Sequence, residues 1–222
     1  METNGVDVER VEGEAGRVLS RVREYVWDGE SLPVPVDDIA ADEFGLLVRL
    51  VDDLSTAPGC ENIPRDQLSG LLLTGPGEIW VNAWEAAQWD GRRRFTIGHE
   101  LGHYVMHRDG RPGIHCRSIV EDPREEAGFE NGPDGGIEPV SGAGREVGTD
   151  EVETESEARL VAGPRSVPEL EANAFAAALI MPRHLMREQY ERHEGDCEAM
   201  RNEFGASQKA MRYRIDAMKT WG

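Results

Sequence analysis

The residues best suited to chemistry are His99, Glu100 and His103, which form an H-E-x-x-H pattern. On a helix, two histidines four positions apart lie one turn above each other on one face. Two such imidazoles can bind one metal ion, and Glu100 can reach a water on that ion without ligating it. The spacing predicts His99 and His103 as metal ligands and Glu100 as a general base. The alternative is an exposed histidine pair, but the flanking runs RFTIG and YVMH are apolar and indicate a buried helix.

A zinc site needs at least three protein ligands, and the remaining histidines and cysteines are poor candidates for the third. His107 lies eight residues after His99, about 12 Å along a helix, so the two cannot bind one ion. The other candidates are expected in a loop (His115, Cys116) or on a polar surface (His184, His193).

A carboxylate from the apolar segment that begins after Ser166 is a better third ligand, because a carboxylate that enters a core needs a partner. Two glutamates are available there, Glu169 and Glu171. Ser166 and Glu169 have the S-x-x-E spacing of a capping box, which gives Glu169 another role. Glu171 is therefore the predicted ligand. The alternative for Glu171 is a first-turn glutamate that interacts favourably with the helix dipole.

The elements that must position these residues follow from hydrophobic periodicity and from turn residues. Together they predict an α+β fold with a short, mostly antiparallel three-stranded sheet. The expected helices cover residues 9–28, 37–43, 92–107 and 166–181, and the expected strands lie at 46–51 and on both sides of the Gly75-Pro76-Gly77 turn within 68–82.

An acidic segment separates the two helices that carry the candidate ligands. Residues 121–157 hold thirteen of the chain's acidic residues and two arginines, and they account for much of the net charge of −19. So few large apolar side chains cannot offset the entropy of ordering. We expect a disordered acidic insert over 109–165, within a domain that spans 9–182 after a flexible tail at 1–8. Residues 183–222 are expected to form a separate helical segment.

The C-terminal segment looks like the second half of a helix-turn-helix. Gly205 is expected in the turn, Ser207 at the start of the helix, and Met211 and Ile215 on its core side. Residues 207–222 contain four basic residues and one acidic residue, a net charge of +3 that predicts at most weak DNA binding.

The composition of the chain limits the cellular compartment and the kinds of partner that we expect. The strong negative charge disfavours binding to nucleic acid or to an anionic membrane. The longest apolar run, residues 174–181, cannot span a bilayer, and the N-terminus lacks the features of a secretory signal. Three widely spaced cysteines without a C-x-x-C pair are typical of a reducing compartment, so we expect a cytoplasmic protein.

Two runs, RFTIGHELGHYVMH and ELEANAFAAALIMP, resemble the ImmA/IrrE family of bacterial and phage metallopeptidases. The resemblance also covers SGLLLTGPGEIWVN and the N-terminal helix with PVPVDDIAADEFG. It implies a small zincin-like, gluzincin-like domain with ligands His99, His103 and Glu171 and with Glu100 as the base. The acidic insert departs from the family, whose two ligand helices are usually linked by a shorter stretch.

These patterns predict a zinc-dependent endopeptidase, in which a water activated by the metal hydrolyses a peptide bond. Manganese is an alternative ion, because it also accepts His and carboxylate ligands. The resemblance implies a substrate of the helix-turn-helix repressor or antitoxin type, in the control of stress, phage or mobile-element genes. A strand such as 78–82 is expected to pair with extended substrate. Tyr104 is a candidate oxyanion donor by proximity, although an aromatic residue there is more typical of a core.

Two other classes of function fit parts of the chain. The first is a transcription regulator that binds DNA through 183–222 and uses the metal site structurally. The second is an interaction module whose acidic insert mimics DNA or tethers a partner.

Overall fold

The computed structural model describes residues 2–3, 5–64, 68–107, 114–118 and 166–221, with only the backbone described at 2–3 and 114–118. The helices are α1 (Val8–Leu19), α2 (Val36–Phe44), η1 (Leu54–Thr56), α3 (Ala83–Gln88), α4 (Asp90–Met106), α6 (Val167–Ile180), α7 (Arg183–Arg192), α8 (Cys197–Phe204) and α9 (Gln208–Met218). The strands are β1 (Glu2–Thr3), β2 (Val6–Asp7), β3 (Leu47–Val51), β4 (Leu68–Leu73), β5 (Glu78–Asn82) and β6 (Ile114–Ser118).

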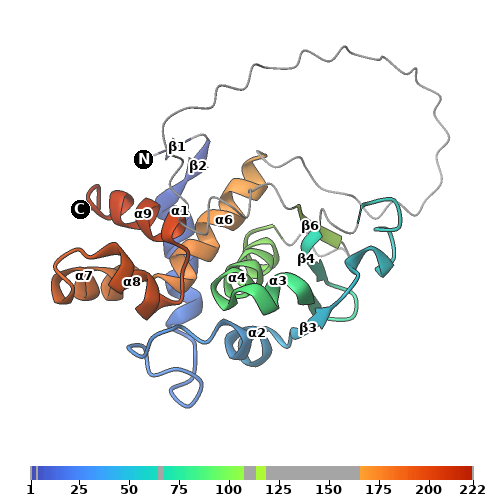
Figure 1. Cartoon of the computed structure of the whole chain (residues 1–222), viewed down its shortest axis with the longest axis horizontal. Helices are drawn as coiled ribbons and strands as arrows, with labels where there is room; N and C mark the ends of the chain where they lie inside the picture. Colours follow the sequence, from blue (N-terminus) through green and yellow to red (C-terminus); the bar gives the residue numbers. More distant parts are fainter. Residues whose placement is uncertain (1, 4, 65–67, 108–113, 119–165, 222) are drawn as a thin grey trace, which may run out of the picture.

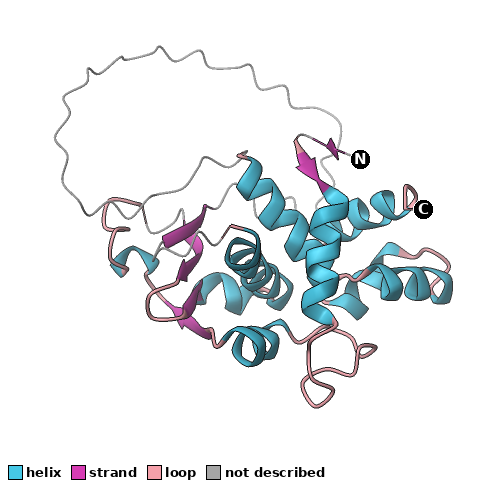
Figure 2. Ribbon diagram, turned by 180° about the vertical axis from the view of Figure 1, so that it is seen from behind, coloured by secondary structure: helices cyan, strands magenta, loops and turns pink. Residues whose placement is uncertain are grey.

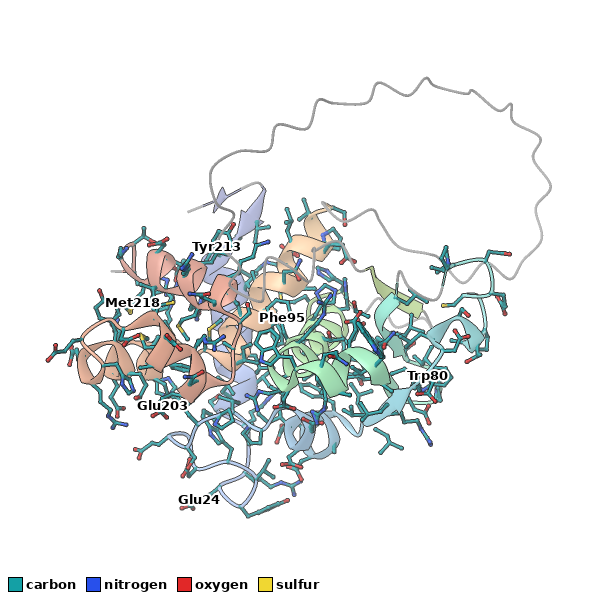
Figure 3. All side chains as sticks on the ribbon, in the orientation of Figure 1. Glu24, Trp80, Phe95, Glu203, Tyr213 and Met218 are labelled. Atoms are coloured by element: carbon teal, nitrogen blue, oxygen red, sulfur yellow. The ribbon has the colours of Figure 1, made fainter. Side chains whose placement is uncertain are left out.

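Helices α4 and α6 occupy the middle of the molecule, between the sheet and the C-terminal helices (Figure 1). The view from behind shows the same order, with the strands of the sheet at one end and α7, α8 and α9 at the other (Figure 2). Trp80 of β5 marks the sheet end of the molecule, and Tyr213 and Met218 of α9 lie at the opposite end (Figure 3). The two central helices are therefore supported from both sides.

The main sheet of the described residues has four strands in the order β3-β5-β4-β6, rather than the three that the sequence predicts. The additional strand is β6, which lies inside the segment expected to be disordered and pairs antiparallel with β4. Strands β4 and β5 are antiparallel, as the turn between them predicts, whereas β3 and β5 are parallel. Because β5 has a neighbour on each side, the expectation that residues 78–82 pair with substrate is wrong.

Most predicted helices are present, and their ends follow ordinary capping rules. Gly45 has φ 65° and ends α2, and Ser166 caps α6 by accepting a hydrogen bond from the Glu169 amide. The first helix is shorter than predicted, since α1 ends at Leu19. The chain beyond it folds back so that the Trp27 ring is buried, and the Trp27 Nε1–H donates to the Ser31 carbonyl at 2.7 Å.

The N-terminus and the acidic insert differ in how far the structure describes them. Strands β1 and β2, which lie within the predicted tail, pair with each other, and Val6 is buried. Apart from β6, the predicted insert over 109–165 lies outside the described residues. Among the helices that the structure describes, none is long and apolar enough to cross a bilayer.

The C-terminal helices are joined to α1 through buried charges. The Arg214 side chain of α9 is 6% exposed and donates to both carboxylate oxygens of Glu12 and, from Nε, to the Met181 carbonyl at 2.9 Å. The Trp221 ring lies under two guanidinium groups, with Cζ of Arg214 at 4.5 Å and Cζ of Arg183 at 4.9 Å from its centroid. Such stacking adds cation–π attraction to the ion pair.

We predict that Arg214→Ala lowers the free energy of unfolding by about 3 kcal/mol, because it leaves a buried carboxylate without its main partner. The estimate is at the low end for buried pairs, since Arg183 Nε still lies 3.3 Å from Glu12. Urea unfolding followed by circular dichroism measures the change. The control is Lys219→Ala, which breaks an exposed pair with Asp216 on the same segment and should leave the midpoint unchanged. Equal effects of the two variants would contradict a structural role for the Arg214 contact.

Candidate metal centre

Helix α4 brings the two predicted imidazole ligands together in the protein interior. His99, Glu100 and His103 are each 1% exposed or less. The rings of His99 and His103 have centroids 4.7 Å apart and are nearly perpendicular, and their Nε2 atoms are 3.1 Å apart. The i, i+4 spacing therefore produces the predicted pair, and the helix that carries it is buried.

The third residue that the structure brings to this pair is Glu169, in the place where the sequence predicts Glu171. Glu169 Oε1 lies 3.1 Å from His103 Nε2, and Glu169 Oε2 lies 3.3 Å from His99 Nε2. Among the described residues, His99, His103 and Glu169 form the one cluster whose donor atoms could hold a metal ion. We call these three residues the donor trio.

Close packing of α6 on α4 explains why Glu169 faces the histidines. A methyl group on Gly102 would lie 2.9 Å from the Cα of Ala172, and one on Gly98 would lie 3.3 Å from the Cβ of Ala176. Ala172 and Ala176 therefore mark the side of α6 that faces α4, and Glu169 lies one turn before Ala172 on that side. Its carboxylate is directed at the imidazoles instead of closing the capping box.

Glu171 lies on another side of α6 and has other partners. It is buried, and Arg10 of α1 donates to its Oε1 atom. Its Oε2 atom lies 3.6 Å from Nε2 of His107, the residue that ends α4. The prediction of Glu171 as the third ligand is therefore not supported by this arrangement, because its carboxylate is part of a different contact.

The spacing of the donor trio fits a tetrahedral metal site. Two ligand atoms at about 2.0–2.1 Å from a tetrahedral zinc ion are about 3.3 Å from each other. The two Nε2 atoms are 3.1 Å apart, and they lie 3.1 and 3.3 Å from the two different oxygens of the Glu169 carboxylate. Two imidazole nitrogens and a carboxylate that face one another in this way form an ordinary zinc donor set, with the fourth position left for another ligand.

Asn173 orients one of these donors, and the two imidazoles keep the Glu169 carboxylate ionised. The Oδ1 atom of Asn173 accepts from Nδ1 of His99 at 3.0 Å, which holds that ring with Nε2 directed at the trio. Burial raises the pKa of the Glu169 carboxyl, but hydrogen bonds from His103 and His99 outweigh it and lower the pKa to about 2. The carboxylate is therefore ionised at neutral pH, as a metal ligand must be.

The carboxylate of Glu100 lies against β4. A methyl group on Gly70 would lie 3.0 Å from Glu100 Oε1 and would collide with the Thr96 methyl group, so only glycine fits beneath the predicted base. The β4 register is irregular between Leu68 and Gly70, as in a β-bulge, a feature common beside active sites.

A buried ion pair fixes that irregular part of β4. Ser69 Oγ donates to Glu85 Oε1 at 3.2 Å, and the other oxygen of Glu85 lies 2.8 Å from Nε of Arg92. Glu85 belongs to α3 and Arg92 to α4, so this contact ties the strand to the helix that carries the donor trio.

The remaining candidates lie away from the trio or have other partners. Tyr104 packs edge-on against Phe44, with centroids 5.5 Å apart, which supports the core alternative over an oxyanion role. His184 Nε2 donates a hydrogen bond to the Gly29 carbonyl, and His193 Nε2 lies 3.7 Å from Glu203 Oε1. For His115 and Cys116 the structure describes only the backbone, within β6.

Sequence reasoning missed two groups that the structure assigns to the site. Asn173 lies four residues after Glu169, the spacing of one helical turn, and this could have indicated a polar face shared with the ligand. Gly98 and Gly102, four residues apart within a predicted helix, could have indicated close approach of a second helix.

Comparison with known families identifies the same region. A family model described as the IrrE N-terminal-like domain, a peptidase family, matches residues 64–128 and 150–216. The match covers more than half of the chain and includes the donor trio and Glu100, but it leaves α1 and α2 outside. No curated protein matches the chain.

We predict that Glu169→Gln loses bound zinc, whereas Glu171→Gln retains about one equivalent. Glutamine at position 169 removes the only anionic ligand of the donor trio, whereas Glu171 is not a member of the trio. Elemental analysis of the purified proteins measures the difference, and the two variants serve as matched controls for each other. Zinc loss from Glu171→Gln alone would restore Glu171 as the ligand.

We predict that Gly102→Ala lowers the free energy of unfolding by about 1–3 kcal/mol and weakens zinc binding, because α6 must move away from α4. Gly16→Ala is the control. It is another helical glycine, and nothing lies within 4 Å of its added methyl group, so we expect no loss of stability or of metal. If Gly102→Ala binds zinc as the wild type does, helix spacing does not set the trio.

Proposed function

The chain belongs to the peptidase family of IrrE N-terminal-like domains, and from this we propose that it is a zinc-dependent endopeptidase. The observation that carries the proposal is the buried donor trio at tetrahedral spacing, with the Glu100 carboxylate on the same helix. In this proposal His99, His103 and Glu169 hold the ion. Manganese is the alternative ion, because the donor set is also compatible with it.

A zinc ion bound there would lower the pKa of a water to about 7 and polarise the scissile carbonyl. Glu100 would take the proton from the attacking water and pass it to the leaving amine, as a general base and then a general acid. Gly70 of β4 leaves room for its carboxylate. Asn173 would keep His99 in the tautomer that presents Nε2.

For the substrate, we propose a regulatory protein of the helix-turn-helix repressor or antitoxin type, cleaved in the cytoplasm to release stress, phage or mobile-element genes. The support is the resemblance of the two ligand-bearing runs to the ImmA/IrrE family, together with the membership in the peptidase family.

DNA binding through the C-terminal helices is the less supported alternative. Of the four basic residues in 207–222, Arg214 is buried against Glu12, and Lys219 pairs with Asp216. Contacts within the chain therefore use part of the +3 charge that phosphate binding would need. We propose that this segment mainly supports the peptidase fold.

The test of the function is Glu100→Gln. This variant should retain zinc, and its rate of peptide cleavage should fall about 10²–10⁴-fold, the usual contribution of a positioned general base. The measurement is the appearance of new protein N-termini, identified by mass spectrometry, in native host cells that express the wild type or the variant.

Glu188→Gln, an exposed glutamate of α7, is the control and should behave as the wild type does. Cleavage products that depend on zinc and on Glu100 support the proposal. A zinc-loaded wild type that produces no more new N-termini than Glu100→Gln would overturn it.

A further inference from the structure

Beside the donor trio lies a second group of interacting side chains, Arg10, His107 and Glu171, which we call the Glu171 clamp. Its members come from α1 (Arg10), from the C-cap position directly after α4 (His107) and from α6 (Glu171). Arg10 donates to Glu171 Oε1, and His107 Nε2 lies 3.6 Å from Glu171 Oε2. None of the three side chains belongs to the donor trio.

His107 connects the clamp to the backbone that carries the third ligand. Because a carbonyl can only accept, His107 donates from Nε2 to the Pro168 carbonyl, at 3.2 Å. Pro168 directly precedes Glu169, so this bond holds the first turn of α6 against the end of α4. The ring of His107 also lies next to that of His103, with centroids 5.6 Å apart.

Arg10 contacts α6 one turn further along, through Glu171. The Glu171 side chain is 8% exposed and that of Arg10 is 43% exposed, so an otherwise buried carboxylate obtains its cation from a helix at the surface. A buried carboxylate that loses such a partner has to be solvated or protonated, and either change removes the contact that holds α6 to α1. The start of α6 is thus held by His107 at Pro168 and by Arg10 of α1 at Glu171.

We infer that the Glu171 clamp is a positioning device that sets the first turn of α6 and thereby places the Glu169 carboxylate for metal binding. The inference rests on the proposed function insofar as Glu169 is a metal ligand. It adds that α1, which lies outside the family match, contributes to the metal site through Arg10. Glu171 then acts through Glu169 and does not touch the ion.

The test measures the metal site itself, in the full chain. Zinc affinity is obtained by competition with a chromophoric chelator, and the visible spectrum of the cobalt(II)-substituted protein reports the ligand geometry. Arg10→Ala and Glu171→Gln should each keep one equivalent of metal, bind it about tenfold more weakly and shift the cobalt bands, since outer-shell changes typically cost 10–100-fold. With a cleavable substrate, kcat should fall while KM is unchanged.

Two further variants separate positioning from general stability. Arg17→Ala removes an arginine of the same helix whose partner, Glu14, lies on α1 itself, so zinc affinity and the cobalt spectrum should be those of the wild type. Arg10→Lys restores a cation and should recover part of the affinity. If Arg10→Ala does not fold, Arg10→Gln, which keeps most of the side-chain length, replaces it.

The outcomes distinguish this inference from the proposed function. Wild-type affinity and spectrum in Arg10→Ala and Glu171→Gln, with only a lower unfolding temperature, would overturn the clamp and leave the peptidase intact. Complete loss of metal from Glu171→Gln, with metal retained by Glu169→Gln, would overturn the clamp and make Glu171 the ligand. Weaker metal binding in the clamp variants, combined with no Glu100-dependent cleavage, would support the clamp and overturn the peptidase.

Discussion

The distance between α4 and α6 is the constraint on which the site depends. Two donors of the trio lie on α4 and one on α6, so their spacing follows from how closely the helices approach. Gly98 and Gly102 permit that approach, because Ala172 and Ala176 occupy the space that larger side chains would fill. Glycine within a helix costs roughly 0.5–1 kcal/mol relative to alanine. The two glycines are therefore explained by packing and ligand spacing, and not by helix formation.

Buried carboxylates extend this constraint to the rest of the molecule. Three carboxylates whose side chains are at most 9% exposed pair with an arginine of a different element: Glu12 with Arg214 of α9, Glu85 with Arg92 of α4, and Glu171 with Arg10 of α1. A buried charge is stable only with such a partner, so each pair fixes two elements relative to each other. As a result α1 contacts both α6, which carries Glu169, and the C-terminal helix α9.

The sheet supplies the other support of the site. Strand β4 lies between β5 and β6, and its Gly70, next to an irregularity in the β4–β6 register, lies against the Glu100 carboxylate. Membership in a peptidase family and the buried donor trio agree on the same region of the chain. The Glu100 carboxylate, our proposed general base, therefore lies between a helix that carries two donors and a strand that admits only glycine at the contact.

The sequence by itself determined the helices and strands whose signals are local: the H-E-x-x-H helix, the capped helix after Ser166 and the β4–β5 hairpin. It could not determine strand β6, because that strand is stabilised by hydrogen bonds to β4, distant in sequence. Nor could it decide between Glu169 and Glu171, which differ by about 200° around the helix axis. The capping rule favoured Glu171, but contact with Gly98 and Gly102 turns the face that bears Glu169 toward the imidazoles. Only tertiary packing decides which side of a helix faces its neighbour, and that choice selected the third donor.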